Sequence, residues 1–438
     1  MNLDATIMRL VKLLRFAREL KGKKPVNIDR IQSMGLLAVK LGQICALRPD
    51  LLDPDRCIAL QELYSRAPTI PEENFEKLLS KFTADDFRSH FKHIDSKPFA
   101  AASIGQIHRA ELLDGTKVVI KIIKADFKKS FKKDVKRMKR WVRIGLFFNP
   151  KLRKVGNPIG LLAHIEDYTL RELNLLNEID GKERLENLAR EYKVKFPMPK
   201  LSFPKIWNDL SNENVLVVEE VTAPTLESHL NAGTLEWDDM LQLFRIHGAF
   251  MFGLGVFHGD LHPGNAMMDD NKNFIFIDTG AICEAPNHVR KALFGFFYFL
   301  ARGELQNAFD AMLTMADTKP TGKTLSTYYS SMNELYEGFV GTSVSEVSLT
   351  EQMMKTVKAA VLAGCSFGDD AFPIIRSLMY MDGMVLKGHP QVDLISSMGP
   401  YLDEFATLID PKTLLGRTQN KQWDLMEKNR TLKPKTVA

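Results

Sequence analysis

The chain has 438 residues, of which 45% are hydrophobic and 26% charged, with a formal net charge of +5. These values are typical of folded globular proteins, exclude a chain disordered throughout, and allow two or three domains or one two-lobed enzyme. The four cysteines form no C-x-x-C pair, which argues against a disulfide framework or a zinc site, and no apolar stretch reaches the roughly 18 residues of a membrane-spanning helix.

The first twenty residues predict a basic amphipathic helix. Apolar residues from Leu3 to Ala17 recur at helical spacing, while Arg9, Lys12 and Arg15 fall on the other face. Three interpretations stay open for it: a helix on an anionic membrane, an import presequence, or a helix packed on the rest of the protein.

A β-hairpin is predicted around Asp114-Gly115, because strand-forming residues flank this turn signal from 107 to 113 and from 117 to 123. A long helical region follows from 126 to about 188, and residues 215–221 form a buried strand. After Thr222 the pattern is mostly helical, with one strand at 274–277. The tail from Pro411 is polar and basic.

The strongest chemical signal is the loop from His258 to Asn265, followed by Asp278 just after a strand. Phosphoryl transfer needs a carboxylate near the attacking oxygen and oxygen ligands that hold Mg²⁺ on the nucleotide. The spacing predicts Asp260 as the base and Asn265 and Asp278 as metal ligands. The alternative is a polar turn in which these side chains only cap the backbone.

Lys121 lies in the second strand of the predicted hairpin, in a run of apolar residues that resembles the V-A-I-K motif of kinases. In the chain, Lys121 comes before a Glu-bearing helix and the Asp260 loop, which is the order found in kinases. This order favours a lysine that binds phosphate over a lysine at a sheet edge whose amine only reaches water. The loop before the hairpin contains one glycine, and its small residues allow close approach to phosphates. The candidate nucleotide contacts there are Ala100, Ala101, Ala102 and Ser103.

Glu172 and Glu178 are both candidates to pair with Lys121. On one continuous helix they would point roughly 120° apart, so different partners are expected. The alternative is a solvated charged helix face.

These motifs, read together with Lys40-Leu41-Gly42-Gln43 and Arg48-Pro49-Asp50, resemble the UbiB/ABC1 atypical kinase family, also called the AarF or coenzyme Q8-kinase-like family. The resemblance covers about residues 30–300. It implies an α+β, two-lobed protein-kinase-like fold with a helical N-terminal extension. The residue ranges expected are 1–97 for the extension with its K-x-G-Q motif, 98–221 for the N-lobe with a helical insert, 222–410 for the mainly helical C-lobe, and 411–438 for the tail.

The resemblance also implies residue roles. Lys121 would be the ATP lysine with Glu178 as its ion-pair partner, and Glu172 would act with Lys40. Glu219 and Val221, at the end of the 215–221 strand, are further expected contacts of the nucleotide. In the family the extension covers the nucleotide site, which disfavours phosphorylation of other proteins.

Two residues depart from the family pattern. Asn174 stands where the family has the Asp of E-x-D, which removes a negative charge near Lys40. Thr279 replaces the Phe of D-F-G, which is expected to remove an apolar anchor while leaving Asp278 as a metal ligand.

The segment 124–154 predicts a second basic amphipathic helix, suited to anionic lipid headgroups or simply solvated. No stacking platform accompanies it, so nucleic acid is not expected. The leading hypothesis is an ATP- and Mg²⁺-dependent atypical kinase or ATPase that supports ubiquinone or related isoprenoid-lipid biosynthesis, in the cytoplasm or on a membrane surface. The alternatives are a nucleotide-binding scaffold of a biosynthetic complex and a small-molecule phosphotransferase.

Overall fold

The computed structural model describes residues 15–409, apart from 17, 21, 23, 47–51, 66–68, 102, 126, 149–157, 368–371 and 408. The predicted N-terminal helix and C-terminal tail therefore lie wholly or largely outside the described residues. The chain divides into two compact units, one made of residues 1–229 and 260–282 and the other of residues 230–259 and 283–438. None of the four cysteines, all of which lie in the described part of the chain, forms a disulfide bond.

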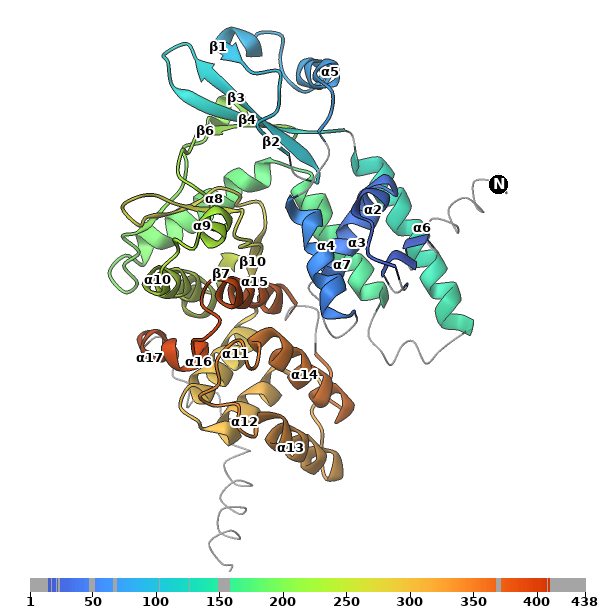
Figure 1. Ribbon diagram of the computed structural model, residues 1–438, viewed down its shortest axis with the longest axis vertical. Coiled ribbons are helices and arrows are strands. Elements are labelled where there is room, and N and C mark those ends of the chain that lie inside the picture. Colours follow the sequence, from blue (N-terminus) through green and yellow to red (C-terminus); the bar gives the residue numbers. More distant parts are fainter. Residues whose placement is uncertain are drawn as a thin grey trace, which may run out of the picture. The chain divides into compact units, whose positions relative to one another are not determined.

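The first unit contains an antiparallel sheet (Figure 1). Its strands run in the order β1-β3-β4-β6, and β2 pairs with β3. The predicted hairpin is confirmed as β3 and β4, with Gly115 at φ +88° and Asp114 accepting a hydrogen bond from the Thr116 amide. The strand bounds are β1 (Phe91–Ile94), β2 (Ala100–Ala101), β3 (Gly105–Leu112), β4 (Lys117–Ile123) and β6 (Val215–Glu219).

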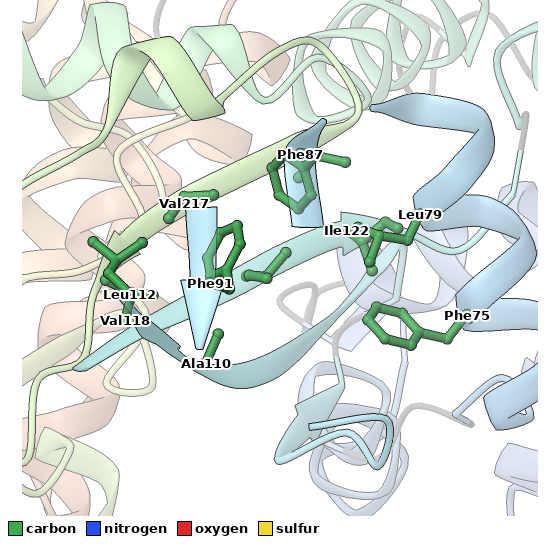
Figure 2. Packing of buried hydrophobic residues seen from close by; sticks show 11 residues of the cluster. Phe75, Leu79, Phe87, Phe91, Ala110, Leu112, Val118, Ile122 and Val217 are labelled. Atoms are coloured by element: carbon green, nitrogen blue, oxygen red, sulfur yellow. The ribbon is translucent and has the colours of Figure 1, made fainter. Parts of the chain in front are cut away.

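The core of this sheet is built by alternation along its strands. Val118, Ile120 and Ile122 are fully buried, because every second side chain of a strand points to the same face. The helix α5 (Glu72–Phe82) packs its apolar side chains Phe75 and Leu79 into the same cluster, as Figure 2 shows. A short 3₁₀ turn, η1 (Phe87–His90), adds Phe87. Lys121 lies on the opposite face of β4, because it alternates with these buried residues.

Three helices precede α5, namely α2 (Ile28–Ser33), α3 (Leu36–Ala46) and α4 (Pro54–Ser65). They share one apolar cluster that includes Ile31, Leu60 and Leu63. Gly42 allows the close packing of α3, since a Cβ there would lie 2.5 Å from a methyl carbon of Leu63.

The predicted long helical region is three helices, α6 (Phe127–Phe148), α7 (Pro158–Glu172) and α8 (Leu176–Glu191). The expectation that Glu172 and Glu178 share one helix is wrong. Glu172 ends α7, whereas Glu178 lies in the first turn of α8. The Asn174 side chain accepts a hydrogen bond from the Leu176 amide, which helps to start a new helix there.

The expectation of a single strand after Thr222 is also wrong, because four short strands occur there. Each has only three residues, too few for a period-2 pattern to show in the sequence. In the first unit β9 pairs in parallel with β5 and antiparallel with β8. The bounds are β5 (Leu201–Ser202), β7 (Val256–His258), β8 (Ala266–Met268), β9 (Phe274–Phe276) and β10 (Ile282–Glu284), with a 3₁₀ turn η3 (Asn208–Leu210).

The second unit is mainly helical. Its core is rich in fully buried aromatic side chains, among them Phe250, Phe294 and Tyr328. The π-helix η4 (Ala249–Leu254) continues α10 (Trp237–Gly248), and a left-handed Gly255 ends it before β7. The helix bounds are α9 (Leu226–Ala232), α11 (Asn287–Leu300), α12 (Leu305–Met315), α13 (Lys323–Tyr336), α14 (Leu349–Leu362), α15 (Phe372–Gly388), α16 (Leu394–Ser397) and α17 (Gly399–Ala406). Across the described ranges, no helix is both long and apolar enough to cross a bilayer.

Candidate active site

Lys121 lies on the face of β4 opposite the core, where its side chain is 13% exposed. Its amine Nζ lies 2.5 Å from Glu178 Oε1 and 2.9 Å from Asp278 Oδ2. Three residues that are far apart in the sequence thus meet at one point in the first unit. Of the two predicted partners of Lys121, the structure selects Glu178.

The electrostatics of this cluster favour a charged lysine. Burial lowers the pKa of Lys121, but the charges of Asp278 and Glu178 outweigh it and raise that pKa above its ordinary value. Burial and the charge of Asp278 raise the pKa of Glu178 to about 7, against the opposing effect of Lys121. Two carboxylates, those of Glu178 and Asp278, surround the single ammonium group of Lys121. A further cation bound at this site would therefore offset their excess negative charge.

The Asp278 loop is attached to α8 by hydrogen bonding and close packing. The Thr279 hydroxyl donates to the Glu178 backbone carbonyl at 2.7 Å, and Thr279 is only 4% exposed. The apolar anchor is absent, as expected, but the position still attaches the loop to α8 through this hydrogen bond. A buried hydrogen bond stands where the family has an apolar side chain.

Gly181 is a site residue that the sequence reasoning missed. A Cβ at this position would overlap the Thr279 carbonyl, so only glycine lets α8 approach the Asp278 loop this closely. The signal was present in the sequence, because a glycine inside a helical pattern lowers helix stability and is retained for a packing reason.

The loop that carries Asp260 is held by its own hydrogen bonds. The Asn265 side-chain amide donates to the Asp260 carbonyl at 2.9 Å and approaches its carboxylate Oδ2 at 3.4 Å. The Ile277 amide donates to the Asn265 carbonyl at 3.1 Å, in line with the β8–β9 pairing. Asn265 and Asp278 are the two predicted metal ligands. The strand pairing brings Asn265, at the end of the loop, close to Asp278.

Lys40 and Glu172 form an ion pair in the first unit. Lys40 is 6% exposed, and its amine lies 5.5 Å from the centre of the Tyr168 ring. The expected pairing of Lys40 with Glu172 is therefore present in the structure. The Asn174 side-chain oxygen accepts a hydrogen bond from the Leu176 amide at the start of α8.

The remaining predicted contacts lie at the edges of the sheet. Ala100 and Ala101 form β2, paired with Ile107 and Gln106, and Ser103 is half-buried in the loop before β3. Ala102 lies outside the described residues. Glu219 ends β6 with an exposed side chain, and Val221 follows it, half-buried.

A second missed residue is Arg376 of α15, in the second unit. Its guanidinium donates from Nε at 3.0 Å and from Nη2 at 2.6 Å to the carbonyl of Gly259. Ser377 donates to the carbonyl of His258 at 3.2 Å. The signal was an arginine within an apolar helical run, since arginine is rarely buried without partners, and here it is 4% exposed.

No cluster of three or more His, Cys, Asp or Glu side chains suited to a metal ion occurs among the described residues. Magnesium does not require one, because it usually takes one or two carboxylates together with waters and substrate phosphates. Asn265 and Asp278 supply amide and carboxylate oxygens of the kind that this ion prefers.

The chain is similar in sequence to known kinase-like proteins. The chain is 24% identical over 423 residues to "Probable protein kinase UbiB" of Pseudomonas fluorescens (strain Pf0-1), covering 91% of this chain and 76% of that protein. It is 24% identical over 391 residues to "Protein ACTIVITY OF BC1 COMPLEX KINASE 7, chloroplastic" of Arabidopsis thaliana, covering 87% of this chain and 54% of that protein.

Among solved structures, a complex of Rv3197 with erythromycin from Mycobacterium tuberculosis matches with a TM-score of 0.51 and 19% identity, covering 93% of this chain and 98% of that one. The predicted α+β kinase-like fold is confirmed. The model of the ABC1 atypical kinase-like domain matches residues 62–312, more than half of the sequence. The chain therefore belongs to the ABC1 atypical kinase-like family, as its motifs predicted.

Proposed function

We propose that this protein binds Mg·ATP and transfers its γ-phosphoryl group to an acceptor or to water. The observation that carries the proposal is the cluster of Lys121, Glu178 and Asp278, with Nζ to oxygen distances of 2.5 and 2.9 Å. A lysine held by a helix carboxylate and placed beside a metal-binding aspartate is the arrangement that kinases use to bind nucleotide phosphates.

Each residue has a defined role in the proposal. Lys121 binds the α- and β-phosphates, and Glu178 orients its amine. Asn265 and Asp278 would hold Mg²⁺, which neutralises charge that develops on the phosphates. The loop residues Ala100, Ala101, Ala102 and Ser103 are the proposed contacts of the phosphates, and Glu219 and Val221 are the proposed contacts of the rest of the nucleotide.

Asp260 is proposed as the residue that accepts a proton from the acceptor hydroxyl or water. Its loop geometry supports this role, because Asn265 fixes the backbone at Asp260 through the 2.9 Å hydrogen bond. Lys40 and Glu172 are proposed to act as a pair that controls the acceptor side of the site, and their burial supports a fixed position for both.

The test is Mg²⁺-dependent ADP release by the wild type and by Asp278→Asn. We expect the rate of ADP release to be about 100-fold or more lower in the variant, because the loss of a charge that stabilises the transition state has effects of this size. Asp270→Asn is the matched control, since Asp270 is exposed in the turn between β8 and β9. The absence of Mg²⁺-dependent ADP release from the wild type, with or without anionic liposomes, would contradict the proposal.

A scaffold that binds nucleotide without needing turnover is the second candidate. The observation that favours it is Asn174, whose amide caps a helix where the family has a carboxylate. Cells carrying Asp260→Asn and Lys121→Ala separate the two functions. Function that survives Asp260→Asn but not Lys121→Ala would make nucleotide binding alone the biological activity.

We extend the proposal to ubiquinone or related isoprenoid-lipid biosynthesis at a membrane surface, as the family resemblance implies. The exposed basic face of α6 supports a peripheral membrane location, because each basic residue near an anionic surface contributes about 1 kcal/mol. This face consists of Lys129, Lys132, Lys133, Lys136, Arg140 and Arg143. Co-sedimentation with anionic but not neutral liposomes, lost when these residues become Gln, is the expected result.

A further inference from the structure

The first unit contains a cavity of about 270 Å³ whose described lining shares one residue, Ser103, with the proposed nucleotide contacts. A bridging water occupies about 30 Å³ of liquid volume, so this space is far larger than a single buried water needs. Its described lining residues are Gln32, Gly35, Leu36, Val39, Leu63, Thr69, Ile70, Ser103, Lys124, Ala125 and Phe127. They come from α2–α4, from the segment before α5, from the open end of the β3–β4 hairpin and from the first residue of α6.

One wall of the cavity is fixed by the K-x-G-Q segment. The Gln43 side-chain amide donates to the Leu63 carbonyl at 2.9 Å, and Gln43 is 7% exposed. Gly42 packs against the Leu63 side chain, where a Cβ would be 2.5 Å from a methyl carbon. Both motif residues therefore hold Leu63, a lining residue, in place.

A second lining residue, Ile70, is held by a buried chain of hydrogen-bonded side chains. The Ile70 amide donates to Gln106 Oε1 at 2.9 Å, and Gln106 Nε2 lies 2.8 Å from His108 Nε2. His108 Nδ1 lies 2.8 Å from the Asp95 carbonyl, so Nδ1 carries the proton and Nε2 accepts from Gln106. Gln106 and His108 are fully buried, and His108 stacks on Phe75 with a centroid distance of 3.6 Å.

The lining is mostly apolar and contains one lysine. Leu36, Val39, Leu63, Ile70 and Phe127 contribute hydrocarbon surface, and no acidic side chain occurs among the described lining residues. Lys124 is 7% exposed, and burial lowers its pKa to about 8. An anionic group beside this amine would favour its charged form, because an opposite charge offsets the cost of burial.

We propose that this cavity is a binding site for a small apolar acid, with its hydrocarbon body against Leu63 and Ile70 and its anionic group paired with Lys124. A preformed apolar pocket with few polar groups is the usual form of a small-molecule site. Here the walls are set by Gln43, Gln106 and His108, residues to which the nucleotide chemistry gives no role.

The test uses octanoate as the probe, with the full chain and no nucleotide, so that its outcome is independent of ATP turnover. We expect saturable binding by calorimetry, weaker binding of 1-octanol and octylammonium, and a loss of about tenfold or more in octanoate affinity in Lys124→Met, as expected for a hydrogen bond to a charged group. Lys128→Met is the matched control, because Lys128 is exposed on α6 and does not line the cavity.

Two cavity-filling variants, Val39→Phe and Ala125→Leu, separate binding in the cavity from binding elsewhere. We expect each variant to weaken the binding of octanoate and of 1-octanol by a similar factor. At least one of the two variants should keep the wild-type melting temperature. Octanoate binding that is absent from the wild type, or that persists unchanged in Lys124→Met and in a folded cavity-filling variant, would overturn the proposal.

Discussion

The Thr279 hydroxyl donates a 2.7 Å hydrogen bond to the backbone carbonyl of Glu178, the residue whose carboxylate pairs with Lys121. One residue of α8 thus holds Lys121 with its side chain and the Asp278 loop with its backbone. The position of the Asp278 loop and the position of Lys121 depend on the same turn of α8.

Thr279→Val should test this link, because valine keeps the shape and removes the hydroxyl. We expect a stability loss of about 1 kcal/mol, the usual net value of one buried hydrogen bond, and weaker Mg·ATP binding. Urea unfolding and nucleotide titration measure the two effects. Thr279→Ser keeps the hydroxyl and should restore both, and a valine variant that behaves like the wild type would show that the hydrogen bond is unimportant.

Gly181→Ala should move α8 away from the Asp278 loop. An alanine Cβ would overlap the Thr279 carbonyl, and overpacking of this kind costs about 1–3 kcal/mol. The control is Gly145→Ala on α6, where the added Cβ meets no atom within 4 Å. Thermal unfolding should show a lower midpoint for Gly181→Ala only, and equal midpoints for the two variants would refute the close-approach argument.

Lys121→Met and Glu178→Gln should both weaken ATP binding. The first removes the phosphate-binding charge, and the second removes the carboxylate that orients it at 2.5 Å. We expect about tenfold weaker binding in each case, by the loss of a charge-assisted hydrogen bond. Lys117→Met is the control on the same strand, as its side chain is 63% exposed. Unchanged nucleotide affinity in Lys121→Met would remove the basis of the proposed function.

Arg376→Met should loosen the segment that leads into the Asp260 loop. The guanidinium makes two hydrogen bonds to the Gly259 carbonyl, and Gly259 directly precedes Asp260 in the chain. We expect a stability loss of about 2 kcal/mol, as for hydrogen bonds to a charged group, together with slower ADP release. Lys355→Met, exposed on α14, is the control. Full activity and stability in Arg376→Met would exclude a positioning role.

His247 should make the protein sensitive to acid. Burial, and to a smaller extent the nearby His258, lowers the pKa of His247 to about 3, whereas an unfolded histidine has a pKa of about 6.5. Below about pH 6.5 the imidazole of His247 is therefore protonated in the unfolded state but not in the folded state. The free energy of unfolding falls as the pH drops below this value, by up to about 1.4 kcal/mol per pH unit. Above that pH the contribution is fully present.

Urea unfolding of the wild type and of His247→Gln between about pH 7 and pH 5 measures this effect, with an expected difference of about 2 kcal/mol between their pH dependences. Gln does not titrate, so the variant should have the flatter profile. His288→Gln replaces an exposed histidine on α11 and should keep the wild-type profile. Parallel profiles for the wild type and His247→Gln would contradict the prediction.

The hairpin was predictable because its information is local. Asp114-Gly115 specifies the turn, and the apolar run from Val118 to Ile123 specifies a half-buried strand. The break between α7 and α8 was not predictable from periodicity, because Glu172 and Glu178 both fit a helical pattern. The break depends on the hydrogen bond from the Leu176 amide to the Asn174 side chain and on the packing of two separate helices.

The small strands after Thr222 were missed for a related reason. The segments β7, β8 and β10 have three residues each, and their pairing depends on partners elsewhere in the chain. Gly181 and Arg376 escaped notice because their contacts, the Thr279 carbonyl and the Gly259 carbonyl, are about a hundred residues or more away in sequence.

The sequence alone determined the family, the kinase-like fold and the candidates Lys121, Asp260, Asn265 and Asp278, because motif order and spacing are properties of the chain itself. Only the tertiary structure decided that Glu178 rather than Glu172 pairs with Lys121, that Thr279 replaces an apolar anchor with a hydrogen bond, and that Gln43 and Gln106 hold two residues, Leu63 and Ile70, that line one cavity. Those outcomes depend on distances between segments that are remote in sequence, and only close packing sets such distances.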